Sequence, residues 1–140
     1  MVYLDTSVLA AYYCPEPMSD QVESVILAAD RTAISSLNEV EFVSALARKV
    51  QEKELTNEVA NRILNEFQSH VDHSLYHRFT IEHHHYQKAF HWIAGFNTPL
   101  RTLDALHLAL AATESAELMT ADKQLAKAAK FFGVSAVLIG

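Results

Sequence analysis

The sequence predicts an α/β domain in which a parallel, twisted β-sheet of four to five strands is flanked by helices. Short apolar runs recur along the chain, and longer segments with apolar residues at helical spacing separate them. Strands that alternate with helices in this way pair in parallel through helical crossovers. The 140 residues, half of them hydrophobic, suit one domain spanning residues 1–140 and are too few for two.

In the N-terminal half, the first expected helix ends early because Pro15 and Pro17 interrupt its pattern. We expect strands at residues 2–4 and 32–35, and helices at residues 7–13, 18–29, 37–52 and 58–70. The third of these helices carries two apolar stripes, one of Val40, Val43, Ala47 and Val50 and another of Phe42 and Leu46.

In the C-terminal half, the segment 103–113 is apolar nearly all round, which predicts a central, buried helix. Residues 95–99 form the clearest loop, and Gly133 is a typical stop signal after a helix. We expect strands at residues 78–81, 117–120 and 135–139, and helices at residues 82–93, 103–113 and 123–132.

The charge balance restricts the classes of function. Lys and Arg total 11 and Asp and Glu total 17, a net charge of −6 that argues against broad electrostatic wrapping of nucleic acid. A single cysteine, Cys14, cannot form an intramolecular disulfide and indicates a reducing compartment. We find no leader and no apolar run of membrane-spanning length, so we expect a cytoplasmic domain that does not associate with membranes.

Four acidic residues lie in or beside sequence that otherwise reads as core: Asp5, Glu41, Asp104 and Asp122. A buried carboxylate is costly unless a partner or a metal compensates its charge. Asp5 and Asp122 follow expected strands and can share one edge of the sheet, whereas Glu41 and Asp104 must reach that edge from helices. If the four converge, they form an oxygen-ligand site for a hard divalent cation such as Mg²⁺ or Mn²⁺.

Each acid also has a purely structural interpretation. Asp5 and Asp122 can cap the helices that follow them. Asp104 can form a hydrogen bond with His107, which lies on the same face of the helix. Glu41 can be a half-exposed helical residue.

Glu39 is a rival to Glu41 and reads more easily as a solvated side chain. Glu41 shares its helix face with Ala45, a small residue that leaves room for an ion or a substrate. Arg48 lies two turns beyond Glu41 and is a candidate phosphate contact or an ion-pair partner.

Further basic residues and the histidines have alternative interpretations. Lys123, Lys127 and Lys130 recur at helical spacing after Asp122, where they form either a phosphate-steering surface or a solvated helix face. Eight histidines, most of them within residues 70–91, leave a transition-metal site as a second possibility, with exposed polar faces as the alternative.

Taken together, these segments resemble the PIN-domain ribonucleases, and among them the VapC-type toxins of toxin–antitoxin pairs. The matching stretches are VYLDTS at residues 2–7, SSLNEVE at 35–41, SALAR at 44–48, LDALHLALA at 103–111 and LMTADKQLA at 118–126. Their order and spacing cover essentially the whole chain, although residues 57–98 hold no diagnostic motif.

The resemblance implies a three-layer α/β/α fold and a metal-dependent endoribonuclease that cleaves tRNA or rRNA. It implies a homodimer and silencing by a cognate small antitoxin protein. The family's metal-site acids fall on Asp5, Glu41, Asp104 and Asp122, and its neighbouring polar residues on Thr6 and Thr120. We assign Asp5 and Asp104 as principal ligands, with Glu41 and Asp122 holding ligand water or a second ion.

Two other functions remain open at this point. One is an inactive PIN-like binding module, and the other is an α/β protein whose histidines coordinate a metal.

Overall fold

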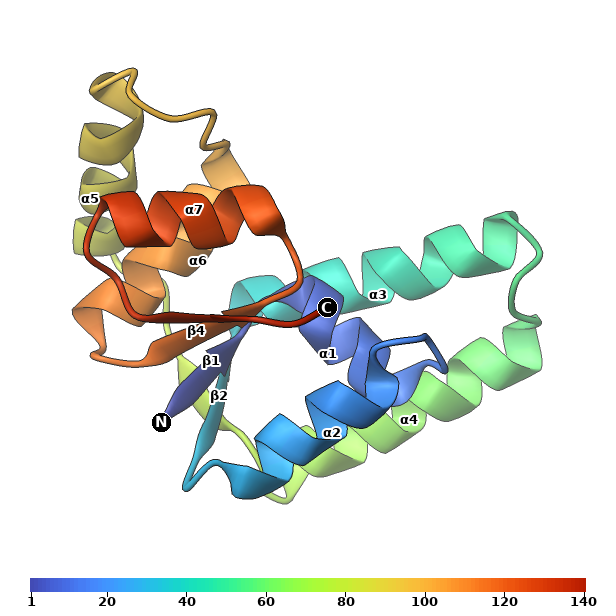
Figure 1. The fold of residues 1–140 in the computed structure, drawn as a ribbon. Helices are drawn as coiled ribbons and strands as arrows, with labels where there is room; N and C mark the ends of the chain where they lie inside the picture. Colours follow the sequence, from blue (N-terminus) through green and yellow to red (C-terminus); the bar gives the residue numbers. More distant parts are fainter.

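The sheet contains five strands, all parallel, in the computed structural model, which describes all 140 residues (Figure 1). The strands are β1 (Val2–Leu4), β2 (Thr32–Ser35), β3 (His77–Phe79), β4 (Glu117–Thr120) and β5 (Ala136–Leu138). Their order is β3-β2-β1-β4-β5, so β1 is central and pairs with both β2 and β4. The predicted parallel sheet is confirmed.

Seven helices cover the two faces of the sheet, which gives the three-layer arrangement (Figure 1). They are α1 (Thr6–Tyr13), α2 (Ser19–Ala28), α3 (Ser36–Gln51), α4 (Asn57–Asp72), α5 (His83–Ala94), α6 (Thr102–Thr113) and α7 (Lys123–Phe131). The first four lie on one side and the last three on the other, and α3 and α4 project beyond the sheet as a pair (Figure 1). None of the seven combines the length and apolar composition that a bilayer-spanning segment requires.

The central strand is buried on both faces, as parallel sheets require. Leu4 belongs to the larger core, which β1 shares with α1 to α4. The side chain of Tyr3 points to the other face and packs with residues of α6 and α7, among them Leu108 and Leu125. Because successive side chains of a strand point to opposite faces, β1 joins the two cores.

Strand β3 lies slightly earlier in the chain than the predicted 78–81. In the pairing with β2, Ser35 lies opposite Phe79 and is the last residue of its strand. Beyond Phe79 there is no partner strand, so β3 ends there and the chain turns into α5.

Only one of the two apolar stripes of α3 is buried. Phe42 and Leu46 are buried against the larger core, whereas Val40 and Val43 are exposed, Val40 by 70%. The buried stripe is the one that faces α1 and α4, the helices that α3 contacts. An apolar stripe therefore remains on the outer face of α3.

The carboxyl ends of β1, β2 and β4 meet at one edge of the sheet because these strands are parallel neighbours. Helices α1, α3 and α7 begin directly beyond that edge. We refer to it as the carboxyl edge. The C-terminal end of α7 lies just before Gly133, and the φ of 72° at this glycine confirms the predicted stop signal.

Candidate active site

All four predicted acids lie at the carboxyl edge. Asp5 follows β1 directly, and Asp122 follows β4 after one intervening residue. Glu41 reaches the edge from the second turn of α3, and Asp104 from the first turn of α6. Four acidic residues that are far apart in the sequence thus lie at the same edge of the sheet.

Asp5 is a buried, heavily hydrogen-bonded carboxylate, 6% exposed. Its Oδ1 accepts hydrogen bonds from Ser7 Oγ (2.7 Å) and from the backbone N–H of Val8 (3.1 Å), so the residue caps α1. Its Oδ2 accepts a short hydrogen bond from the Thr120 hydroxyl. The capping role and a place in the acidic cluster are therefore compatible.

Asp122 caps α7 in the same manner. Its Oδ1 accepts hydrogen bonds from the backbone N–H groups of Gln124 (2.8 Å) and Leu125 (3.3 Å), while its Oδ2 accepts none from the protein. The backbone N–H of Asp122 donates to Thr120 Oγ1 (3.0 Å), so a single threonine hydroxyl connects Asp122 with Asp5. One oxygen of Asp122 remains available to a ligand.

Asp104 has no hydrogen bond from the protein and is half-buried. Burial raises the pKa of its carboxyl, and the charges of Asp122, Asp5 and Glu41 raise it further against a smaller opposing effect of His107. The alternative interpretation, a hydrogen bond between Asp104 and His107, is not what the structure has, because both ring nitrogens of His107 have other partners. Asp104 is thus a carboxylate whose surroundings favour an added positive charge.

Glu41 is held by two donors on one oxygen. Its Oε1 accepts hydrogen bonds from Thr6 Oγ1 (2.6 Å) and from His107 Nε2 (2.6 Å). Burial raises the pKa of Glu41, but these two donors outweigh that effect and hold the pKa below its ordinary value. The rival Glu39 is occupied elsewhere, in an ion pair with Arg78 at 2.7 Å.

The donor chemistry of the cluster fits a hard divalent ion. Every candidate ligand atom is a carboxylate or hydroxyl oxygen, and Asp104 and Asp122 offer oxygens without protein partners. No three of the four carboxylates have oxygens within 4.8 Å of one another, so an ion shared by the four would be held partly through its water.

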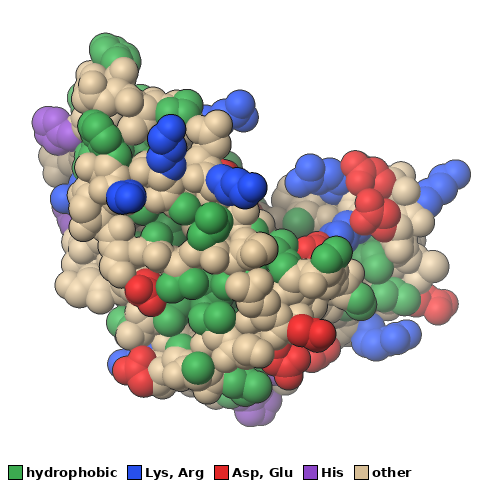
Figure 2. All heavy atoms as spheres, in the orientation of Figure 1, with side chains coloured by type: hydrophobic (Ala, Val, Ile, Leu, Met, Phe, Trp, Pro, Cys, Tyr) green, Lys and Arg blue, Asp and Glu red, His purple; other side chains and the backbone are tan.

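A groove of about 530 Å³ leads away from the cluster along α3. Thr6 and Glu41 line one part of it, and Arg48 and Lys49 line another together with Glu16, Glu52 and Glu54. Lys49 forms ion pairs with Glu16 (3.3 Å) and Glu54 (3.4 Å), whereas Arg48 has no carboxylate partner. Figure 2 shows the surface hollowed between α7 and the projecting end of α3.

The lysines of α7 lie on the other side of that hollow. Lys123, Lys127 and Lys130 are exposed and form no ion pair, and Figure 2 shows basic side chains gathered over α7. Positive charge therefore borders the acidic cluster although the chain as a whole is acidic.

Three supporting residues were absent from the predicted site. Asn38, fully buried, donates from Nδ2 to the carbonyl of Leu4 and to Thr6 Oγ1, both at 3.1 Å. Tyr3 and His107 form a buried chain that ends on Glu41. Two signals in the sequence could have indicated this contact: the tyrosine lies in an apolar strand, and the histidine lies in a helix that is apolar all round. Buried polar groups such as these need partners.

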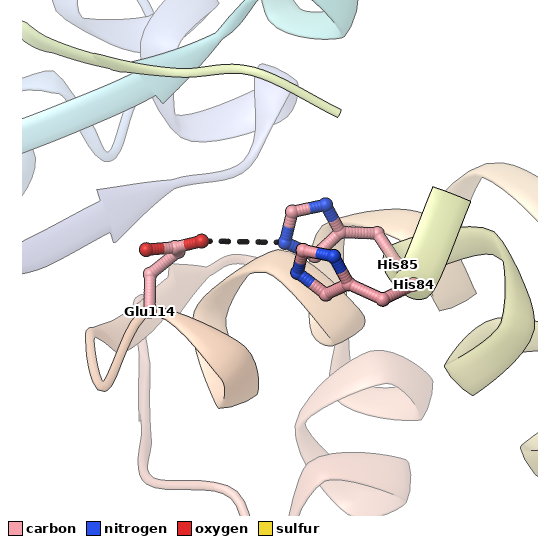
Figure 3. A group of neighbouring side chains, drawn as sticks. All are labelled: His84, His85 and Glu114. Atoms are coloured by element: carbon pink, nitrogen blue, oxygen red, sulfur yellow. Dashed lines mark ion pairs between the residues drawn. The ribbon is translucent and has the colours of Figure 1, made fainter. Parts of the chain in front are cut away.

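A second cluster lies at the other end of α6 and contains His84, His85 and Glu114 (Figure 3). Their ligand atoms lie within 4.8 Å of one another, and His85 Nε2 is 3.3 Å from Glu114 Oε1 without forming a hydrogen bond. However, His85 Nδ1 accepts a hydrogen bond from the backbone N–H of Glu82 (2.9 Å). A neutral ring then carries its proton on Nε2, which leaves no lone pair there for a metal.

The family model for the PIN domain matches residues 2–131. Among solved structures, VapBC2 from Rickettsia felis bound to a promoter DNA fragment matches with a TM-score of 0.72, 16% identity and full coverage of both chains, 100% and 100%. FitAcB from Neisseria gonorrhoeae matches with a TM-score of 0.69 and 18% identity, covering 97% of this chain and 96% of that one.

A third similar structure is VapC20 from Mycobacterium tuberculosis, a toxin described as cleaving the sarcin–ricin loop. It matches with a TM-score of 0.71 and 13% identity, covering 91% of this chain and 95% of that one. No curated protein gives a significant sequence match. At these identities the structural likeness shows the fold, and the family model shows the family.

Proposed function

The chain belongs to the PIN domain family, and we propose that it is a divalent-metal-dependent endoribonuclease, the toxin of a toxin–antitoxin pair. The observation that carries the proposal is the environment of Asp104. This half-buried carboxyl has no protein donor, and burial, followed by the charges of three neighbouring acids, raises its pKa. Such an arrangement disfavours negative charge unless a cation is present.

The four acids contribute to binding Mg²⁺ or Mn²⁺ in two different ways. Asp104 and Asp122 offer oxygens that accept no protein hydrogen bond. Asp5 is fixed by three donors and Glu41 by two, so these residues present oxygens in defined directions. The ion, when bound, supplies a nucleophilic water and offsets the charge that develops at phosphorus.

The basic side chains bordering the cluster suit a phosphate backbone. Arg48 lines the groove, and Lys123 and Lys127 lie on the facing helix without competing carboxylates. We propose that RNA enters between them. Two similar structures support this substrate and a partner protein: VapC20 is a toxin that cleaves the sarcin–ricin loop, and another is a toxin–antitoxin complex from Klebsiella pneumoniae.

The partner proposed here is a cognate antitoxin whose segment occupies the groove along α3. The exposed apolar residues on the outer face of that helix, Val40 and Val43, offer further contact area. We also expect a homodimer, and sedimentation of the purified chain measures it.

The test is cleavage of total RNA by the purified chain with Mg²⁺, Mn²⁺ or EDTA. We expect cutting with either ion and none with EDTA. Asp104→Asn should abolish cutting, and Asp72→Asn, which alters an exposed acid at the end of α4, should leave it unchanged. Full activity of Asp104→Asn refutes the assigned site, and a wild-type chain that binds Mn²⁺ but never cuts RNA indicates a binding module.

A further inference from the structure

His107 is buried in α6 and connects the smaller core with the acidic cluster. The side chain is 2% exposed. Its Nδ1 lies 2.6 Å from the hydroxyl of Tyr3, and its Nε2 lies 2.6 Å from Glu41 Oε1. The Tyr3 hydroxyl in turn lies 2.8 Å from Ser35 Oγ. A continuous chain of polar contacts therefore runs from Ser35 through Tyr3 and His107 to Glu41.

The number of protons available to Tyr3 and His107 determines whether His107 donates or accepts at Glu41. Tyr3 has one hydroxyl proton and two neighbours. If Tyr3 donates to His107 Nδ1, the ring is neutral and its proton is on Nε2. If Tyr3 donates to Ser35 instead, Nδ1 carries a proton, and the contact with an ionised Glu41 requires a further proton on Nε2. With Glu41 as a carboxylate, His107 therefore donates from Nε2 in both arrangements.

At Glu41 the two donors occupy a single oxygen. Oε1 accepts from His107 and from Thr6, while Oε2 accepts no hydrogen bond from the protein. Thr6 is itself oriented by Asn38, which donates to its hydroxyl (3.1 Å). Glu41 also lines the groove, and Oε2 is its oxygen without a protein partner.

We propose that His107 is a positioning residue that locks Glu41 through Oε1, so that Oε2 alone is presented to the divalent ion or to its water. Tyr3 anchors the imidazole from the far side and prevents it from turning. The inference rests on the proposed function, because it assigns His107 a part in the same site. It also excludes His107 as a proton acceptor for the nucleophile, since both ring nitrogens are engaged.

Two polar variants separate the two nitrogens of the ring. His107→Gln places an amide N–H near the position of Nε2 and keeps the donor to Glu41, whereas His107→Asn places one near Nδ1 and loses it. The readout is Mn²⁺ binding, followed by the electron paramagnetic resonance signal of free Mn²⁺. Partners that orient a metal ligand typically contribute roughly 10–100-fold to metal affinity.

We expect His107→Asn to weaken Mn²⁺ binding by about tenfold and His107→Gln by less than about threefold. Cleavage of RNA should follow the same order. Equal binding by both variants and the wild type overturns the inference, as does weaker binding by His107→Gln than by His107→Asn, which would assign the important contact to Tyr3.

A double-mutant cycle tests whether His107 acts through Glu41. In a Glu41→Ala background, His107→Asn should cause no further loss of Mn²⁺ affinity. A loss as large as in the wild-type background contradicts the proposal, because it would show an effect that bypasses Glu41.

A measurement without metal keeps the inference separate from the proposed function. In chain labelled with ¹⁵N-histidine, the Nε2 proton of His107 should give a slowly exchanging resonance that disappears in Glu41→Ala. Its persistence overturns the contact, even if His107→Asn fails to fold. If instead this resonance behaves as expected while the wild type neither binds Mn²⁺ nor cuts RNA, the nuclease proposal fails and the contact stands.

Discussion

Two buried histidines in this molecule each face a glutamate, and their surroundings differ. His107 has partners at 2.6 Å on both ring nitrogens. His85 has a partner on Nδ1 only, while its Nε2 lies 3.3 Å from Glu114 without a hydrogen bond. Both rings are almost completely buried, at 2% and 0% exposure.

The difference follows from what each pair connects. His107 joins α6 to the first strand and to α3 at the carboxyl edge, where the acids gather. His85 lies on the first turn of α5 and closes a capping box with Glu82, so it belongs to the local start of a helix. Three consecutive histidines draw attention to the second region, yet the geometry makes the isolated histidine the one coupled to the acidic cluster.

The largest expected contrast is in cleavage of RNA by two matched variants. Glu41→Gln should lower the rate on the order of 100-fold, because the carboxylate that faces the site is lost. Glu114→Gln should change it by less than about twofold, since Glu114 lies at the far end of α6. Initial rates at saturating Mn²⁺ measure both, and similar rates for the two variants would remove the functional distinction between the pairs.

Stability should separate the histidines by a smaller amount. His107→Leu leaves the Tyr3 hydroxyl and one donor position at Glu41 unfilled inside the protein, at a cost of about 2–3 kcal/mol in the free energy of unfolding. His85→Leu loses one capping hydrogen bond, about 1 kcal/mol. Urea unfolding with EDTA present compares them, and an equal loss would indicate that the His107 hydrogen bonds contribute no more than a cap.

The acids beside His107 should respond to pH with opposite signs. The pKa of Asp104 is raised, so its contribution to stability is present at acid pH and is lost as pH rises through the folded-state value. The pKa of Glu41 is lowered, so its contribution is present at neutral pH and is lost as pH falls through the folded-state value. At pH 7, without metal, Asp104→Asn should therefore be more stable than the wild type and Glu41→Gln less stable.

Solvent screening at these half-buried groups keeps each of the two shifts to about 0.5–1 kcal/mol. Urea titrations at pH 7 and near pH 4 measure them. The gain of Asp104→Asn should shrink at the lower pH, and a gain that grows there would reverse the assigned sign.

The smallest expected effect is that of Zn²⁺ on the second pair. Because His85 Nε2 carries a proton, Zn²⁺ at micromolar concentration should leave the unfolding temperature unchanged. Thermal scans of the wild type and of His85→Gln with and without Zn²⁺ test this. A zinc-dependent rise that His85→Gln removes would show that the ring gives up its bond to Glu82 in order to bind metal.

Much of the architecture could be predicted because its signals are local. Pro15 and Pro17 mark the end of α1, the all-round apolar segment becomes the buried α6, and Asp5 and Asp122 follow strands that share an edge. The partner of His107 could not be predicted in this way. Spacing along α6 favours Asp104, whereas the approach of α3 across the edge decides for Glu41, a residue distant in sequence. The same holds for Glu39, whose ion pair with Arg78 depends on how β3 lies beside β2.

The hydrogen bonds of the acids also indicate which of these residues a related chain without the proposed activity would lose first. Asp5 and Asp122 each begin a helix, so replacing either one weakens the fold as well as the chemistry. Asp104 holds nothing in place, and its loss relieves crowding of like charge. In related chains that lack the proposed activity, position 104 should change first, while aspartates at positions 5 and 122 persist because they cap helices.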